Sequence, residues 1–246
     1  MNMSDNTAVL FVGTHPDDIE IGCGGTIQVF RNSGLSPIGL VMTIGHDKED
    51  IRRRDAVLKS SELLGYTPEF GNILSVDLTD GRVEATVGKF IDEYKPIAVF
   101  GHSRKDSHRS HRIVSDGTDS AARRVRNRLH YVGPEGEYEF SPNVFFTFTE
   151  EEFRRKVEAL AIHREAYGDA RYFHEEYLNL NGSLGQRVLQ YVQRTESPYV
   201  FNEFGGKHRP YAEGFENRHL VNPVLSGSLF FDKEMLELAK TVGGTE

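Results

Sequence analysis

Short apolar runs alternate with longer amphipathic segments through the first half of the chain. The apolar runs are Ala8–Val12, Ile38–Thr43 and Ile97–Phe100, with a weaker one near Asn72–Ser75. Helical spacing is found at Gly25–Asn32, Ile51–Leu64 and Ala85–Tyr94, and Ser103–Arg128 is typical of a further helix. Continuous apolar strands separated by helices predict a parallel sheet that is covered on both faces.

The second half continues this pattern for one more unit and then loses it. Asn143–Phe148 is rich in aromatic and branched residues and predicts a strand. Thr149-Glu150-Glu151-Glu152 forms a capping box that predicts a helix through about His163. From Gly168 onward turn formers are frequent, notably in Asn181–Gly185 and Phe204–Pro210. We therefore predict a single α/β domain over residues 1–246, with a Rossmann-like, doubly wound, mostly parallel sheet (about 7–165) and an irregular C-terminal cap (about 166–246).

Charge and composition exclude several classes of partner. The 37 acidic residues outnumber the 29 basic ones, and the formal net charge of -8 argues against general affinity for nucleic acid or anionic membranes. No apolar run is long enough for membrane insertion, and the N-terminal residues lack a signal-peptide pattern. The lone Cys23, which we expect to pack in a glycine-rich turn, is typical of a reducing compartment. We expect a cytoplasmic protein, and a homo-oligomer is compatible with the sequence.

The most informative segment follows the first apolar run and reads Thr14-His15-Pro16-Asp17-Asp18-Ile19-Glu20. It places a histidine and paired carboxylates at the C-terminal end of a buried strand, where open α/β sheets bind ligands. His15 and Asp18 are three residues apart and could reach one metal ion, while Asp17 would point elsewhere and could hold a water. The alternative, in which Asp17 or Asp18 only caps the next helix, requires one acid and not a cluster.

Glycines 22, 24 and 25 invite comparison with a dinucleotide-binding loop. The fingerprint Gly-x-Gly-x-x-Gly would need a glycine where this chain has Ile27. The adjacent acids would also repel a phosphate from the helix N-terminus. A nicotinamide enzyme is therefore disfavoured.

A second cluster follows the Ile97–Phe100 strand and comprises His102, Asp106, His108 and His111. The carboxyl ends of parallel strands share one edge of a sheet, so the two clusters can meet. A catalytic zinc site usually needs three protein ligands and an open position. Histidine nitrogen and carboxylate oxygen donors suit Zn²⁺ and would also accept Fe²⁺, Co²⁺ or Mn²⁺.

The first cluster, with Gly24-Gly25-Thr26 after it, resembles the opening motif of the LmbE/PIG-L family of zinc-dependent N-deacetylases. Asp106, His108 and His111 are similar to the family's second motif, Asp-x-His-x-Asp-His. The resemblance implies removal of an acetyl group from an N-acetylated amino sugar or its conjugate, a small-molecule substrate, by metal-activated water. The roles that it implies are metal ligation by His15, Asp18 and His111, and catalysis by Asp17 and His108.

One position departs from the family's pattern, because Ser110 stands where the second motif has an acid. That carboxylate would stabilise the charged form of the catalytic histidine. Without this carboxylate we expect the charged form of His108 to be stabilised less strongly, or Asp106 to take over the role of the missing acid. The departure also motivates an alternative function, a metal-containing binding module of the same fold with little or no catalysis.

Three further segments carry weaker resemblance. The family has a substrate-facing arginine at the head of the helix that begins with Ile51-Arg52-Arg53-Arg54, and we expect Arg53 to take that role, with Asp106 as a second substrate contact. The Lys156…Ala159-Leu160…His163 pattern resembles a family helix, and Ala212-Glu213-Gly214-Phe215 matches a C-terminal motif. We expect both of these later segments to be structural.

Overall fold

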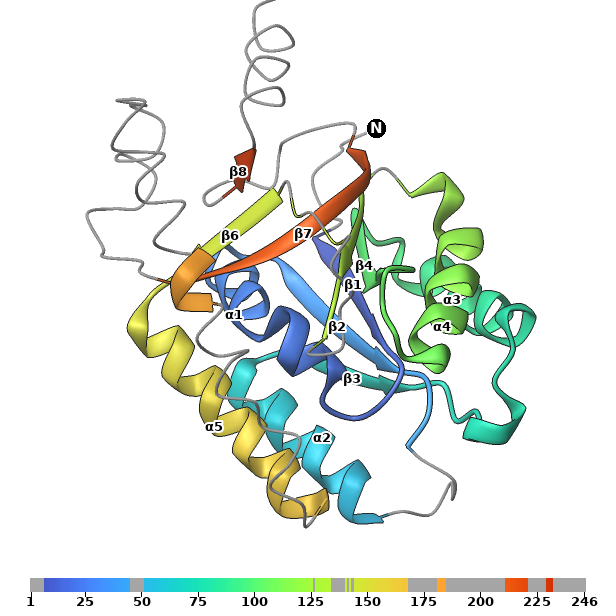
Figure 1. Ribbon diagram of the computed structural model, residues 1–246, viewed down its shortest axis with the longest axis horizontal. Helices are drawn as coiled ribbons and strands as arrows, with labels where there is room; N and C mark the ends of the chain where they lie inside the picture. Colours follow the sequence, from blue (N-terminus) through green and yellow to red (C-terminus); the bar gives the residue numbers. More distant parts are fainter. Residues whose placement is uncertain are drawn as a thin grey trace, which may run out of the picture.

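The computed structural model describes residues 7–44, 51–125, 127–133, 140, 142, 144–167, 181–184, 211–220 and 229–231. These residues form an eight-stranded sheet with strand order β3-β2-β1-β4-β5-β7-β6-β8 (Figure 1). The parallel strands are β1 (Ala8–Gly13), β2 (Ser36–Val41), β3 (Thr67–Phe70), β4 (Ala98–His102) and β5 (Asn127–Tyr131). The antiparallel strands are β6 (Val144–Phe148), β7 (Tyr211–Leu220) and β8 (Leu229–Phe231). The predicted α/β class with a mostly parallel sheet is confirmed.

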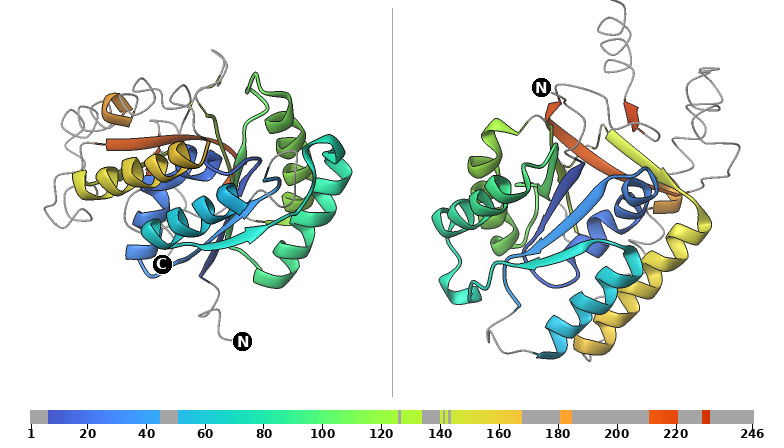
Figure 2. Two further views of the ribbon diagram at one scale, coloured as in Figure 1. Left: turned by 90° about the horizontal axis from the view of Figure 1, so that it is seen from below. Right: turned by 180° about the vertical axis from the view of Figure 1, so that it is seen from behind.

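Alternate side chains of β1 enter two separate hydrophobic cores, one on each face of the sheet. Val9 and Phe11 pack with residues of α1 (Asp18–Asn32), α2 (Ile51–Leu64) and α5 (Glu150–Tyr167). Leu10 and Val12 pack with residues of α3 (Asp80–Tyr94) and α4 (Arg109–Ala121). Helices therefore cover both faces, as Figure 2 shows, which explains why the central strands are apolar throughout.

Several predicted boundaries were wrong, and β3 is the clearest example. The third strand is Thr67–Phe70, and the predicted strand near Asn72–Ser75 is instead a loop that ends where a 3-10 helix begins (η1, Ser75–Asp77). Because β3 lies at the edge of the sheet, it tolerates Pro68 and half-exposed side chains that an apolar-run criterion passes over.

The predicted helix Ser103–Arg128 was also too long. It comprises a loop, α4, a 3-10 helix (η2, Ala122–Arg124) and the start of β5. The strand β5 was missed because its sequence, Asn-Arg-Leu-His-Tyr, mixes polar and apolar residues. By contrast, the predicted capping box is confirmed: the Thr149 N–H donates to Glu152 Oε2 at 2.7 Å, and the Glu152 N–H donates to Thr149 Oγ1 at 3.3 Å.

The glycine-rich segment is helix and not turn, since α1 begins at Asp18 and Cys23 lies buried within it. A Cβ atom at Gly22 would lie 2.2 Å from the Tyr131 ring, and one at Gly25 would lie 2.4 Å from the Phe148 ring. These glycines therefore allow α1 to pack closely against the sheet.

The C-terminal region contributes strands to the sheet, in addition to the irregular cap that was predicted. Strand β7 pairs with β5 on one side and with β6 on the other, and so completes the sheet. Of the segments predicted as turns, Phe204–Pro210 lies outside the described residues. No helix in the part of the chain that the structure describes is long and apolar enough to cross a membrane.

Candidate metal centre

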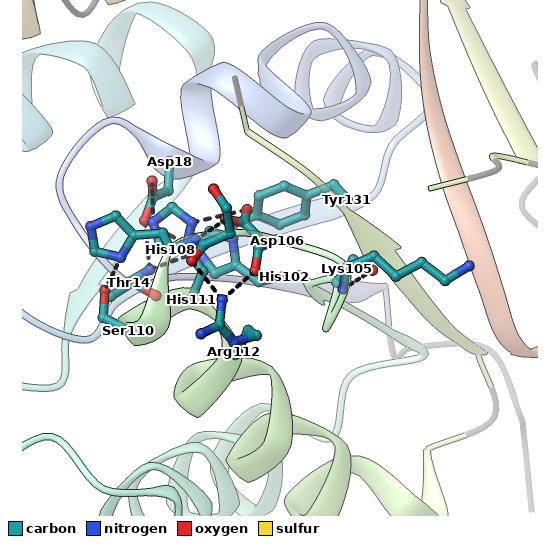
Figure 3. A network of polar contacts seen from close by, with 12 residues as sticks. Thr14, Asp18, His102, Lys105, Asp106, His108, Ser110, His111, Arg112 and Tyr131 are labelled. Atoms are coloured by element: carbon teal, nitrogen blue, oxygen red, sulfur yellow. Dashed lines mark hydrogen bonds and ion pairs between the residues drawn. The ribbon is translucent and has the colours of Figure 1, made fainter. Parts of the chain in front are cut away.

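Two loops at neighbouring strand ends bring the two polar clusters together. Strand β1 leads into the loop that carries His15, Asp17 and Asp18, and β4 leads through His102 and Asp106 to α4, which carries His111. Because β1 and β4 pair in parallel, both loops leave the sheet at its carboxyl edge. Figure 3 shows the resulting network, in which side chains of both loops face one another.

Three side chains converge at the centre of this network, and Asp18 faces the two histidines with different carboxylate oxygens. His15 Nδ1 lies 3.2 Å from His111 Nε2, and 3.4 Å from Asp18 Oδ2. His111 Nε2 lies 3.4 Å from Asp18 Oδ1. Tetrahedral zinc with bonds of about 2.0–2.1 Å separates its ligand atoms by about 3.3–3.4 Å. The donor types and their spacing therefore fit a divalent cation such as Zn²⁺.

The structure offers two overlapping groups of three residues whose donor atoms lie close enough to share an ion, within the described part of the chain. One consists of His15, His108 and His111, and the other of Asp18, His102 and His111. Only His111 belongs to both groups. The set predicted from the sequence combines His111 with His15 from the first group and Asp18 from the second. The distances between these three residues are the ones given above.

Asp18 is held by hydrogen bonds from its own loop. Its Oδ2 accepts from the backbone N–H of Thr14 at 2.9 Å and of His15 at 2.7 Å, and lies 3.2 Å from His102 Nε2. These contacts concentrate on Oδ2, which leaves Oδ1 directed at His111. The sequence placed His102 in the cluster but assigned it no role; it is fully buried and stacks on His111, with ring centroids 4.1 Å apart.

Asp106 lies behind His111, on the side of its Nδ1 atom. It is completely buried; its Oδ2 lies 3.0 Å from His111 Nδ1, and its Oδ1 accepts from the His108 backbone N–H at 2.9 Å. Asp106 was expected to contact substrate, and in the structure both of its carboxylate oxygens have partners within the protein. A carboxylate on the far nitrogen of a metal-binding histidine orients the ring and makes it more basic.

The electrostatics of the site favour positive charge at its centre. Burial by itself lowers the pKa of His111, but the negative charges of Asp18 and Asp106 and their hydrogen bonds raise it to about 10. The neighbouring His102 behaves in the opposite way, because burial and the positive charge of His111 lower its pKa to about 4. A cation bound between Asp18 and His111 would take the place of the proton that these carboxylates stabilise.

Asp17 adopts an unusual backbone conformation beside this centre. It occupies the N-cap position of α1 with φ 110°, yet its side chain makes no capping hydrogen bond. Burial, followed by the nearby charges of Asp18 and Glu20, raises the pKa of Asp17 well above its ordinary value. The simple capping role considered for this residue is therefore excluded, and strain of this kind is concentrated at functional sites.

His108 and Arg53 also interact with residues of this centre. The His108 ring lies edge-on to His15, with centroids 5.0 Å apart, and its Nδ1 lies 2.7 Å from Ser110 Oγ. Arg53 donates to the carbonyl of Ile44 at 3.4 Å, and its charge lowers the pKa of Asp17, against the larger effect of burial. Its neighbours differ: Arg52 is exposed, and Arg54 stacks over the Phe70 ring at 3.9 Å.

Two buried networks hold α1 in place, and they involve the later sequence segments. Lys156 Nζ donates to Glu213 Oε1 at 2.6 Å and to the Ile21 carbonyl at 2.7 Å, and Glu213 also accepts from the backbone N–H of Gly25. The contacts of Lys156 and Glu213 agree with the structural role expected for the two segments that contain them.

The second network centres on Glu20. Its Oε1 accepts from the hydroxyls of Ser60 and Tyr66 and lies 3.2 Å from His163 Nε2. Burial opposes ionisation of Glu20, but His163 and these hydroxyls lower its pKa to about 2. Glu20 thus joins the first turn of α1 to α2 and α5.

Comparisons with known proteins agree with this architecture. The family model described as PIG-L, GlcNAc-PI de-N-acetylase, matches residues 10–122, which include both clusters. The uncharacterized deacetylase YaiS of Escherichia coli (strain K12) is 26% identical over 166 residues, which cover 63% of this chain and 90% of YaiS.

Two solved structures share the fold at low identity. The N,N'-diacetylchitobiose deacetylase from Pyrococcus horikoshii has a TM-score of 0.60 at 18% identity, covering 90% of this chain and 88% of its own. GalB, the 4-carboxy-2-hydroxymuconate hydratase from Pseudomonas putida KT2440, has a TM-score of 0.71 at 18% identity, covering 89% and 100%. Since a deacetylase and a hydratase share this fold, the fold alone does not select the reaction.

Proposed function

We propose that this chain is a deacetylase of the PIG-L/LmbE family, and that it removes the acetyl group from an N-acetylated amino sugar or amino-sugar conjugate. The observation that carries the proposal is the convergence of His15 Nδ1, Asp18 Oδ1/Oδ2 and His111 Nε2 at separations of 3.2–3.4 Å. These three residues would hold the metal ion, with Zn²⁺ as the cation that best suits their donors.

When bound there, such a cation would supply Lewis-acid chemistry and would lower the pKa of the attacking water towards about 7. Asp17 is adjacent in sequence to the ligand Asp18 but lies outside the proposed ligand set. In this role the Asp17 carboxylate accepts the proton of the attacking water and then delivers it to the leaving amine nitrogen. His108 donates a hydrogen bond to the oxyanion that develops on the amide oxygen.

The remaining residues position these groups. Asp106 orients His111 from behind, and His102 supports Asp18. The charge of Arg53 lowers the pKa of Asp17, and we assign Arg53 to substrate contact. We retain the expectation of a single catalytic domain over residues 1–246.

The test is acetate release by the zinc-loaded, full-length protein from a panel of N-acetylated monosaccharides, disaccharides and amino-sugar conjugates. We expect acetate and free amine in equal amounts from at least one compound, and loss of activity on removal of zinc by a chelator. Asp17→Asn is the matched variant, because it should keep zinc while the rate of acetate release falls by about 10²–10⁴. Stoichiometric zinc without cleavage of any amide would instead favour the metal-containing binding module.

A further inference from the structure

The hydroxyl of Ser110 lies between the rings of two site histidines. Ser110 Oγ is 2.7 Å from His108 Nδ1 and 3.3 Å from His15 Nε2. Ser110 is in the first turn of α4 and is half-buried. At this position the related motif has an acid, so a contact made by a serine hydroxyl is specific to this chain.

The other ring nitrogen of His15 determines the direction of these hydrogen bonds. His15 Nδ1 faces Asp18 and His111, on the side where the cation is proposed to bind. A nitrogen that ligates a metal carries no proton, so the proton of a neutral His15 ring is on Nε2. With a cation bound at Nδ1, the Nε2–H group of His15 would donate to Ser110 Oγ.

The single hydrogen of the serine hydroxyl is then left for His108. A hydroxyl can accept one hydrogen bond while it donates another, and its nearer neighbour is His108 Nδ1 at 2.7 Å. A ring nitrogen that accepts a hydrogen bond carries no proton, so a neutral His108 ring has its proton on Nε2. An ionised carboxylate at this position could only accept, and would select the opposite tautomer of His108.

We propose that Ser110 is a positioning residue that sets the tautomer and orientation of both rings, through the relay His15 Nε2–H to Ser110 Oγ–H to His108 Nδ1. The proposal rests on the proposed function, because the cation site determines which nitrogen of His15 carries no proton. The relay gives the neutral His108 ring an N–H group on Nε2, the nitrogen needed to donate to an oxyanion. Ser110 thus takes the place of the acid in the related motif and orients His108 through a different pattern of hydrogen bonds.

The test uses the full-length protein loaded with Zn²⁺ and has two readouts, neither of which is activity. Long-range ¹⁵N–¹H correlation spectra report which nitrogen of each histidine ring carries the proton, and competition with a chelator reports zinc affinity. We expect Nε2–H on both His15 and His108 in the wild type. Ser110→Ala should leave His108 as a mixture of tautomers and weaken zinc binding about 10–100-fold.

Three variants make the test specific. Ser110→Thr keeps the hydroxyl and should restore both readouts, whereas Ser110→Asp should move the His108 proton to Nδ1. Ser120→Ala makes the same chemical change at an exposed site of α4 and should match the wild type.

Each contrary result has a distinct meaning. Wild-type tautomers and zinc affinity in Ser110→Ala, or no rescue by Ser110→Thr, would overturn the relay while the metal site stands. A wild-type protein that binds no zinc would overturn the proposed metal site, and the relay with it.

Discussion

His15 Nδ1 and His111 Nε2 lie 3.2 Å apart, although 96 residues separate them in the chain. His15 follows β1, and His111 lies in the first turn of α4, beyond β4, so the parallel pairing of these two strands creates the contact. Two imidazole nitrogens at this distance, with a carboxylate beside both, are a favourable arrangement for a shared cation. The first two predictions follow from this relationship.

Replacement of His15, Asp18 or His111 by alanine should each reduce bound zinc from one equivalent to a small fraction. Each change removes a donor from the proposed set of three, and should cost more than the 10–100-fold typical of outer-shell partners such as His102. Elemental analysis after gel filtration measures the zinc content, with exposed Asp55→Ala as the control. Full zinc in His111→Ala would refute the site, since His111 belongs to both metal-compatible groups.

Asp17→Asn should retain zinc and lose about 10²–10⁴ in kcat/KM, the usual contribution of a positioned acid–base group. The amide is close in size to the carboxylate but cannot accept the proton of the attacking water. Steady-state kinetics on the best substrate, together with zinc content, measure the effect, and Asp18→Asn serves as a comparison that should lose the metal as well. Metal loss in Asp17→Asn, or a rate near that of the wild type, would contradict the assigned role.

Glu20→Gln should remove a pH-dependent part of the stability. The pKa of Glu20 is about 2 in the folded protein, below its ordinary value of 4.5. Its ionised form therefore stabilises the fold above about pH 4.5, and this contribution declines as the pH falls towards 2. The shift corresponds to about 3 kcal/mol of unfolding free energy at pH 7.

Urea denaturation at pH 7 and at pH 3 measures this difference. The wild type should lose more stability than Glu20→Gln between the two pH values, and exposed Glu62→Gln should behave like the wild type. Equal losses in Glu20→Gln and the wild type would show that the buried carboxylate does not couple stability to pH.

Gly25→Ala and Gly88→Ala should have effects of opposite sign on stability. A Cβ atom at Gly25 would lie 2.4 Å from the Phe148 ring, and overpacking of this kind costs about 1–3 kcal/mol. At Gly88 in α3 nothing lies within 4 Å of the added atom, so alanine should stabilise the protein by about 0.4–1 kcal/mol. Thermal unfolding of both variants checks the prediction, and a neutral Gly25→Ala would show that α1 can move away from the sheet.

Local patterns in the sequence were sufficient wherever the determining interactions are local or the periodicity is strong. The capping box at Thr149 depends on residues three apart, and the two-sided burial of β1 makes its apolar run unmistakable. The same reasoning failed at β5, whose polar residues resemble a helix end, and at β3, where an edge position relaxes the need for apolar residues. It also failed at α1, where glycines are required by close packing and not by a turn.

For the candidate site, the sequence by itself determined which residues share one edge of the sheet, because parallel strands end on the same side. It therefore placed the loop of His15 and Asp18 opposite the cluster that contains His111, and the resemblance to a known family singled out His111 within that cluster. Only the tertiary structure decided which atoms face one another: Asp106 lies behind His111, and Ser110 lies between two rings. These contacts depend on how the loops after β1 and β4 fold against each other, and spacing along the chain carries no information about such distances.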